Sequence, residues 1–542
     1  MFDVVFTGGR LFTSGWDSSR PGALAVADGR IVAAGAADRI GADAREIVDL
    51  QGGLLIPSFL DAHAHPVLGG VEMLQCDLTG AADAAAAVAL VAVYAAANPA
   101  QPWILGGGWT MAHFPGGRPT RQMLDAVVSD RPAALQSRDH HGTWANSAAL
   151  HRAGITASSP DPADGIVERD AHGEPTGYLH EGASNLLYDV LPQVDRDVAV
   201  RGLLAAQDHY LSLGITGWQD AWVGSTASVS DIFGAYVDAV ERDVLRARVT
   251  AALWWERDRG AEQIADLVAR RDRLESLRRP DVLRSDHVKI MIDGVVENFT
   301  AALSHPYLDG HGHATGNLGL TFVDPAALPD SVAALDAAGF SVHFHALGDR
   351  AVTAALDALD AIPGGPTQQR HQLAHLQFVA AQDVPRFARL GAIANLQTLW
   401  AALDEGDLEL TRPFVDDYTF DRQYPLRELR DSGARLAQGS DWPVTRADPF
   451  AAIHVAVNRA EIGRTPDPIL HPEQAIDLAT SLAAYTAGSA AALGYDDSGR
   501  LEVGALADLA VLDRDPFGGP ADEIARTGVR ETWLGGERVW AR

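Results

Sequence analysis

Five short segments of this chain contain side chains that could hold divalent metal ions. Each follows a short run of apolar or β-branched residues, which is typical of a buried β-strand. Imidazole and carboxylate groups are ligands that zinc and similar metals prefer, and a bound metal can activate water. The pattern therefore predicts a metal centre built at several strand ends. In chain order, the candidate ligands are His63, His65, Lys289, His345, His375 and Asp441.

The two histidines of DAHAH can bind one metal ion together. His63 and His65 are two residues apart, and side chains on a strand return to the same face every second residue. The alternative is a polar pair on an exposed strand face, but the flanking residues 54–60 are apolar apart from one serine. By the same rule His343 shares a face with His345 and competes with it as a ligand.

Lys289 stands inside the apolar run VKIMI. An uncompensated ammonium group in a buried strand costs free energy, so such a lysine needs a carboxylate partner or loses its charge. One interpretation is an ion pair with Asp293 or another neighbour. The other is that Lys289 takes part in the metal centre.

Asp441 follows the last of the predicted strands, in AQGSDWP. A carboxylate at that position could bind a metal ion and also accept and return a proton during hydrolysis. The alternative is a helix N-cap, because Ser-Asp before Pro443 is a common helix start. Its place at the strand end favours catalysis.

The residues that must position these side chains alternate between short strands and helical stretches, as a parallel (β/α)8 barrel requires. The expected fold class is α/β. Chemistry in such barrels collects at the carboxyl ends of the strands, where the candidate ligands stand. The eight strands are expected at residues 54–65, 214–221, 246–255, 286–294, 339–346, 370–378, 391–397 and 434–443.

Both ends of the chain have the sequence pattern of short strands separated by glycine turns. Neither end is long enough to bury a core alone, so we expect residues 1–55 and 499–542 to form one small β-sandwich domain. The barrel would then occupy residues 56–498. About 150 residues separate its first two strands, far more than a βα connection needs, so residues 66–213 are expected to form an inserted subdomain over the barrel mouth.

The composition is that of a globular protein, with 47% hydrophobic and 21% charged residues in a chain of 542. A formal net charge of -29 disfavours binding to nucleic acid or anionic membranes. The Ala-rich run from Ala81 contains Asp83 and ends at Asn98-Pro99, so a soluble helix is expected there. One cysteine and an opening without signal-peptide character predict a cytoplasmic protein, and a homodimer is the expected assembly.

The order His-x-His, Lys, His, His, Asp resembles the amidohydrolase superfamily, in particular the branch of N-substituted formamide deformylase (amidohydrolase family 3). The likeness extends over nearly the whole chain. Its other motifs are GGGWT at residues 106–110, HHGTWANSAAL at 140–150, GEPTGYLHE at 173–181 and GRLEVGALADLAVLD near the carboxyl end.

The resemblance implies two divalent metal ions, with zinc expected and manganese, cobalt or iron as alternatives. It assigns His63, His65 and Asp441 to one metal and His345 and His375 to the other, with carbamylated Lys289 as a bridging carboxylate. Tryptophans near the strand ends indicate an aromatic-tolerant pocket for a small-molecule amide. The candidate substrate contacts are His141, Trp144, Trp109 and His343, although Trp144 could instead only anchor its loop.

The activity implied is hydrolysis of a non-peptide C–N bond, most simply in a linear amide such as an N-substituted formamide. Hydroxide on the metal would attack the carbonyl, and Asp441 would shuttle the proton. A deaminase or cyclic-amide hydrolase on the same scaffold is the first alternative, which Lys289 disfavours because deaminases often work with one metal and no strand-four carboxylate. A non-catalytic assembly protein with this fold is the second.

Overall fold

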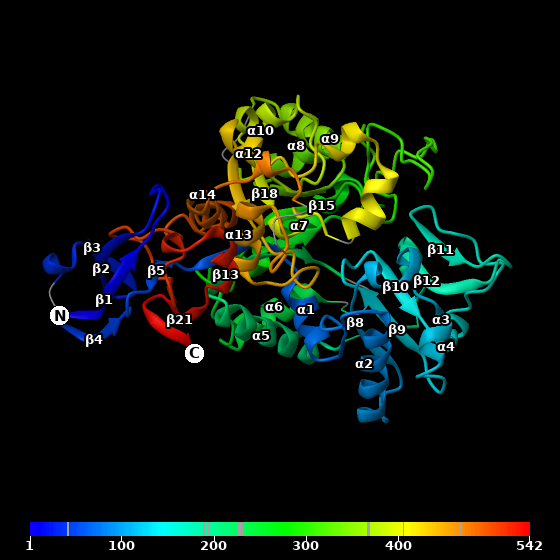
Figure 1. Ribbon diagram of the computed structural model, residues 1–542, viewed down its shortest axis with the longest axis horizontal. Helices are drawn as coiled ribbons and strands as arrows, with labels where there is room; N and C mark the ends of the chain where they lie inside the picture. Colours follow the sequence, from blue (N-terminus) through cyan, green and yellow to red (C-terminus); the bar gives the residue numbers. More distant parts are fainter. Residues whose placement is uncertain are drawn as a thin grey trace.

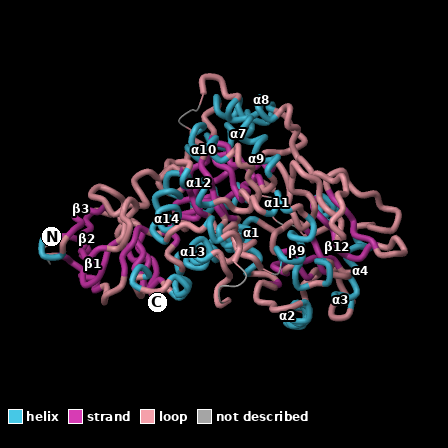
Figure 2. Tube along the Cα trace, turned by 45° about the horizontal axis from the view of Figure 1, so that its top comes forward, coloured by secondary structure: helices cyan, strands magenta, loops and turns pink. Residues whose placement is uncertain are grey.

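The computed structural model describes residues 1–40, 43–187, 190–192, 194–225, 229, 231–365, 369–404, 406–464 and 469–542. It divides into three parts that lie in a row (Figure 1). A sheet that holds both termini lies at one end, a β/α barrel is central, and a second sheet domain lies at the other end. Figure 2 shows three separate groups of strands at these places.

The central part is a parallel barrel of eight strands, which confirms the predicted fold. Extended β-branched and apolar residues form the strands, and all six residues of β6 and of β16 are buried. In sheet order the strands are β6 (Phe59–Ala64), β13 (Ile215–Val223), β14 (Arg248–Trp254), β15 (Leu283–Met291), β16 (Ser341–Ala346), β17 (Gln372–His375), β18 (Ile393–Leu396) and β19 (Arg435–Gln438).

Helices follow the strands and cover the outside of the barrel. Each turns apolar residues toward the strands, as the buried positions of α9 show. Among the described residues, no helix has the length and apolar character needed to span a membrane. The main helices are α5 (Arg196–Ser212), α6 (Ile232–Glu241), α7 (Ile264–Glu275), α8 (Leu328–Ala337), α9 (Asp349–Asp360), α10 (Val384–Leu390), α12 (Leu426–Asp431), α13 (Pro449–Asn458) and α14 (Leu478–Ala483).

The first expected strand, 54–65, proves to be two strands in different sheets. β5 (Leu54–Pro57) pairs with strands of the terminal sheet, whereas β6 pairs with β13 of the barrel. The change occurs at Ser58, whose backbone N–H donates to the Asp508 carbonyl and whose hydroxyl lies 2.5 Å from the Thr216 hydroxyl. Ser58 therefore connects the two domains, because its backbone hydrogen-bonds to the terminal part of the chain and its side chain hydrogen-bonds to a barrel strand.

The terminal sheet combines both ends of the chain in one set of eight strands. β20 (Leu509–Leu512), from the carboxyl end, pairs antiparallel with β5 from the amino end. Apolar side chains of both ends fill one core, which includes Phe6 and Trp533. The other strands are β1 (Phe2–Leu11), β2 (Arg20–Ala27), β3 (Arg30–Gly35), β4 (Ala44–Asp49), β21 (Val529–Leu534) and β22 (Glu537–Ala541).

We predict that deleting residues 499–542 makes the protein insoluble. The deletion removes β20 and exposes the edge of β5 together with the apolar core, which favours aggregation through unpaired strand edges. The soluble fraction and size-exclusion profile after expression measure this. Deleting only 537–542 is the control, because β22 pairs with β21 alone at the sheet edge. A longer deletion that stays soluble and monodisperse would contradict the shared core.

The segment between β6 and β13 forms a domain with its own sheet of six strands. The Ala-rich run forms helix α2 (Ala84–Ala97), as expected, and the Asp83 side chain caps it by accepting from Ala86 N–H. The domain connects to the barrel through α1 (Pro66–Met73), which packs on α5 where Gly70 and Gly202 meet. The strands are β7 (Cys76–Asp77), β8 (Ile104–Trp109), β9 (Ala133–Ser137), β10 (Gly142–Ala145), β11 (Gly165–Arg169) and β12 (Pro175–Glu181).

Candidate metal centre

The predicted ligands come together at the carboxyl ends of the barrel strands. His63 is in β6, His65 directly follows it, and Lys289 and His345 lie near the ends of β15 and β16. His375 is the last residue of β17, and Asp441 lies three residues beyond β19. All six side chains are buried. Separate strands thus deliver them to one edge of the barrel, where barrel enzymes carry their active sites.

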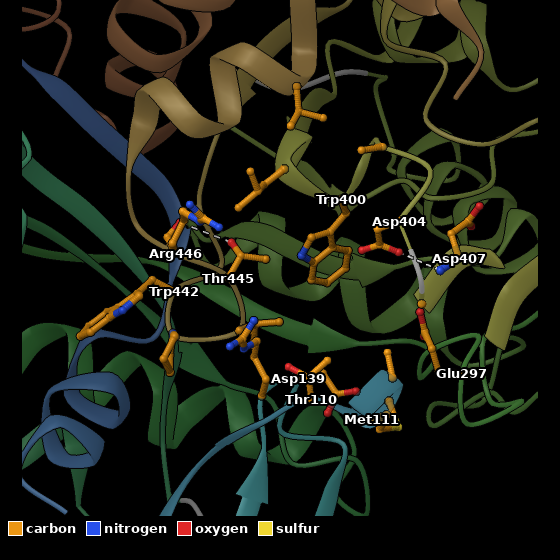
Figure 3. A pocket seen from close by; sticks show the side chains of 18 of the residues that line it. Thr110, Met111, Asp139, Glu297, Trp400, Asp404, Asp407, Trp442, Thr445 and Arg446 are labelled. Atoms are coloured by element: carbon orange, nitrogen blue, oxygen red, sulfur yellow. Dashed lines mark hydrogen bonds between the residues drawn. The ribbon is translucent and has the colours of Figure 1, made fainter. Parts of the chain in front are cut away.

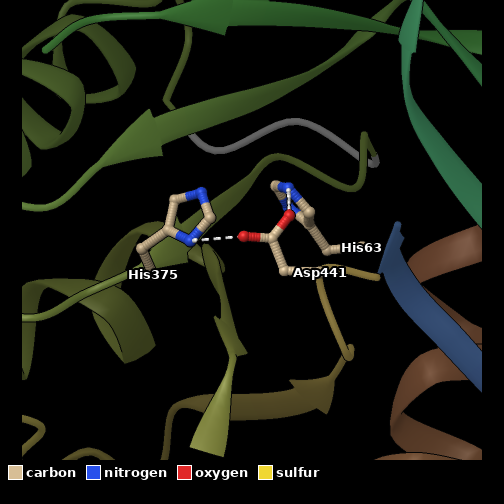
Figure 4. A group of neighbouring side chains, drawn as sticks. All are labelled: His63, His375 and Asp441. Atoms are coloured by element: carbon tan, nitrogen blue, oxygen red, sulfur yellow. Dashed lines mark ion pairs between the residues drawn. The ribbon is translucent and has the colours of Figure 1, made fainter. Parts of the chain in front are cut away.

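Asp441 lies at the centre of this group (Figure 4). Its Oδ1 atom is 3.2 Å from His63 Nε2 and 3.1 Å from His65 Nε2, and its Oδ2 atom is 3.8 Å from His375 Nδ1. Ligand atoms of His63, His375 and Asp441 all lie within 4.8 Å of one another. The alternative role of Asp441 as a helix cap is not observed, because the next helix begins at Pro449 and is capped by Asp448.

The backbone beside Asp441 is held against β6. Asp441 N–H donates to the His63 carbonyl at 2.7 Å, and Asp61 accepts hydrogen bonds from the backbone N–H and hydroxyl of Ser440. A Cβ atom on Gly439 would lie 2.4 Å from His63 N, so only glycine permits this approach. Asp441 itself has a positive φ of 57°, a costly conformation that is found at functional sites.

Lys289 contacts the same group from β15. Its Nζ atom lies 3.4 Å from His63 Nε2, and the side chain is buried. Burial lowers the pKa of Lys289 to about 7, although Asp441 and Asp220 act to raise it. Among the described residues, no ion pair joins it to Asp293. At neutral pH a substantial fraction of the amine is therefore uncharged, and the uncharged form is the one that can add CO2.

Asp293 instead faces His345. Its Oδ1 atom lies 3.4 Å from His345 Nδ1, and its carboxylate accepts backbone N–H groups of Ala302, Leu347 and Gly348. A buried carboxylate behind a histidine orients the ring and strengthens it as a ligand. From the sequence, Asp293 is expected only as a partner of Lys289. The spacing of strand residues does not predict how residues 295–302 fold around its carboxylate.

His343 supports His63 and does not face the substrate cavity. Its Nε2 atom lies 2.7 Å from His63 Nδ1, and its Nδ1 atom lies 2.5 Å from Gln219 Nε2. The side chain is fully buried and absent from the cavity lining. The expected substrate contact of His343 is thus not observed, because the side chain lies behind His63 and away from the cavity.

The donor atoms fit a divalent metal. Three of them are buried and lack hydrogen-bond partners among the residues that the structure describes, namely His65 Nδ1 and both ring nitrogens of His375. Buried polar atoms are rarely left unpaired unless a ligand or ion satisfies them. Burial lowers the pKa of His63, His345 and His375 well below its usual range, so the imidazoles are neutral, as metal ligation requires.

A cavity of about 320 Å³ opens above these ligands. Aromatic rings form part of its wall: Trp222 and Trp254 stack at 4.2 Å between centroids, and Trp400 lies parallel to the His375 ring at 5.3 Å. Such walls suit an apolar or aromatic substituent. The sequence predicts tryptophans near the strand ends, and the structure shows that Trp222, Trp254 and Trp400 line this cavity.

The inserted domain supplies His141 and Glu181 to the same cavity. His141 Nδ1 lies 2.8 Å from Glu181 Oε2, and the Thr300 hydroxyl donates to Glu181 Oε1 at 2.7 Å. Burial lowers the pKa of His141, but the adjacent Glu181 carboxylate outweighs it and raises the pKa to about 9. Glu181 was missed as a site residue, although it ends the quoted motif GEPTGYLHE.

Two further predicted substrate contacts, Trp144 and Trp109, are enclosed in the interior of the inserted domain. Trp144 is fully buried, its indole N–H donates to the Thr120 carbonyl, and it is absent from the wall of the metal-site cavity. Asn146 caps the following helix α4 (Ser147–Arg152). This placement favours the loop-anchoring alternative. Trp109 donates to the Leu135 carbonyl, packs on Trp144, and reaches only the wall of a second, neighbouring cavity.

A parallel barrel with histidine and carboxylate ligands at its strand ends, joined to a sheet made from both termini, defines a metal-dependent hydrolase fold. A family profile described as "Amidohydrolase family" matches residues 46–540. The chain belongs to this family.

Individual relatives cover the whole chain. N-substituted formamide deformylase of Arthrobacter pascens is 27% identical over 99% of this chain and 98% of that protein. The protein LONG AFTER FAR-RED 3 of Arabidopsis thaliana is 29% identical over 99% of this chain and 91% of its own. The crystal structure of an uncharacterised metal-dependent hydrolase from Pyrococcus horikoshii OT3 matches with a TM-score of 0.72 at 25% identity, over 96% of this chain and 99% of that one.

Two further similarities bear on the alternative functions. The exoenzymes regulatory protein AepA of Pectobacterium carotovorum is 31% identical over 77% of this chain and 89% of that protein. A 5-methylthioadenosine/S-adenosylhomocysteine deaminase of Natronomonas pharaonis is 32% identical, but over only 21% of this chain and 28% of its own. The regulatory and deaminase names therefore stand beside the hydrolase names among the relatives.

Proposed function

We propose that this protein hydrolyses a linear, non-peptide amide, such as an N-substituted formamide. The observation that carries the proposal is the position of Asp441, which lies next to three histidines on the wall of a cavity of about 320 Å³. Its likeness to N-substituted formamide deformylase supports the amide as the substrate class.

Two divalent metal ions are proposed, with zinc expected. His63, His65 and Asp441 would hold one ion, and His345 and His375 the other. Lys289, carrying CO2 as a carbamate, would bridge them; the lowered pKa of its amine and its contact with His63 support that assignment. When bound, the metal ions supply activation of water and polarisation of the substrate carbonyl.

Asp441 is the proposed proton carrier. Its carboxylate takes the proton that water loses as the new C–O bond forms, and returns it to the nitrogen as the C–N bond breaks. The products are then an amine and a carboxylic acid, which passes its remaining proton to the amine or to solvent at neutral pH. Burial acts to raise the pKa of Asp441, but the adjacent His65 outweighs it and lowers the pKa, so the group starts as a base.

His141 is the proposed hydrogen-bond donor to the substrate. It lines the cavity opposite the barrel floor, with its ring 5.7 Å from the His345 ring. The pairing with Glu181 keeps it protonated, and a cationic donor stabilises negative charge that develops on a carbonyl oxygen. Trp222, Trp254 and Trp400 would then receive the substituent on nitrogen.

The test is a substrate panel with purified, metal-loaded enzyme and metal-free enzyme as the control. We expect turnover of N-formyl or N-acyl amines and little turnover of hydantoins, lactones or aminopurines. Release of ammonia from aminopurines alone would replace the proposal with deamination. A protein that contains no metal by elemental analysis and has no activity toward any member would favour the non-catalytic alternative.

A further inference from the structure

A second cavity, of about 750 Å³, adjoins the metal-site cavity. Asp139, Trp400 and Val444 line both, so the two cavities lie side by side. Six acidic residues border the second cavity, which we call the acidic chamber. Two of them lie at α13, where Asp448 caps the helix and Glu461 pairs with Arg464 beyond its end. The other four are Asp139, Glu297, Asp404 and Asp407 (Figure 3). These four come from three segments, since Asp139 lies between β9 and β10, Glu297 follows β15, and Asp404 and Asp407 follow β18.

Three of these carboxylates can be checked for a basic partner. Within the described part of the chain, Asp139, Glu297 and Asp407 make no ion pair with a lysine or arginine. Arg138 and Arg446 also border the cavity, and Arg138 donates to the Thr79 carbonyl. Like charges converge here because the fold brings them together, at an electrostatic cost.

A second observation is independent of the charges. Thr411 borders the chamber and is fully buried, and its hydroxyl has no hydrogen-bond partner among the described residues. An unpaired buried hydroxyl is costly unless a ligand or water satisfies it. The rings of Trp400 and Tyr424 also border the chamber, and aromatic faces attract cations.

We propose that the acidic chamber binds a protonated amine carried by the substrate, on the nitrogen side of the scissile amide bond. The proposal rests on the proposed function, in which the acyl part is small and stays at the metal centre. The substrate class is then a mono-acylated diamine or an amide of similar shape with one cationic end. Burial raises the pKa of Glu297 and of Asp407 to about 7, and repulsion from neighbouring carboxylates raises it further. A bound cation would lower the pKa of both groups again.

The test compares two formamides of equal length. N-(5-aminopentyl)formamide is cationic at neutral pH, and N-hexylformamide is its neutral counterpart. We expect wild-type enzyme to prefer the cationic one by at least about tenfold in kcat/KM, the scale of one charge-assisted hydrogen bond. The double variant Asp404→Asn/Asp407→Asn should lower this ratio about tenfold through KM, with metal content unchanged.

Glu409→Gln is the matched control. It removes one negative charge from the same segment, against two in the double variant, but Glu409 is exposed and does not border the chamber, so the ratio should stay at the wild-type value. Equal kcat/KM for the two formamides, or a preference that survives the double variant, would overturn the proposal.

If neither formamide is hydrolysed, the proposed function fails, and the chamber is tested by binding alone. Calorimetric titration of pentane-1,5-diamine into the metal-loaded protein should then give at least about tenfold weaker binding in the double variant than in wild type. Equal binding to both proteins would overturn the chamber as a cation site.

Discussion

Replacing Lys289 with alanine is expected to leave at most one metal ion per chain and to reduce turnover at least about 100-fold, the upper range for losing even a supporting group of a metal site. The physical reason is that the variant removes the group proposed to bridge the two ions, while His63, His345, His375 and Asp441 remain in place. Elemental analysis beside kcat on one substrate of the panel makes the measurement. Two metals and normal turnover in Lys289→Ala would exclude the bridging role.

Two controls separate bridging from folding. Lys289→Glu restores a carboxylate on a shorter side chain, so it should retain more metal than Lys289→Ala. Reconstitution of metal-free wild type with and without added bicarbonate should differ in metal content, because the carbamate needs CO2. Unchanged melting temperatures of metal-free wild type and Lys289→Ala would show that the variant folds.

Asp441→Asn is expected to keep most of its metal while kcat falls by about 100-fold or more, the scale of general acid–base catalysis. Asparagine keeps the size and one oxygen donor but loses the basicity. His63 and His65, with the proposed bridge, would still hold the same ion. Metal content and kcat measured on the same preparation distinguish this from simple ligation, in which the two would fall together.

The control for Asp441 is Asp477→Asn. Asp477 caps α14 and borders neither cavity, and asparagine caps a helix as well as aspartate does, so metal content and kcat should stay unchanged. Near wild-type turnover with full metal in Asp441→Asn would remove this residue from the mechanism.

The sequence by itself determined the barrel and the six candidate ligands, because both are local signals. Period-two spacing in DAHAH placed His63 and His65 on one face, and a lysine in the apolar run VKIMI had to be buried. In a parallel barrel every strand carries its last residues to the same edge, so ligands on separate strands meet without further information. Their order along the chain matches one family, and that resemblance added the expected assignment of each ligand to one of two metal ions.

Tertiary structure alone decided the partners of those residues and the substrate space. Asp293 lies near Lys289 in the chain but faces His345, His343 packs behind His63, and Trp144 is enclosed in the inserted domain. Such contacts depend on how the loop after β15 folds and how the inserted domain docks, which strand periodicity does not encode. The acidic chamber is the clearest case, because Asp139 and Asp407 are 268 residues apart and only the assembled fold brings them together.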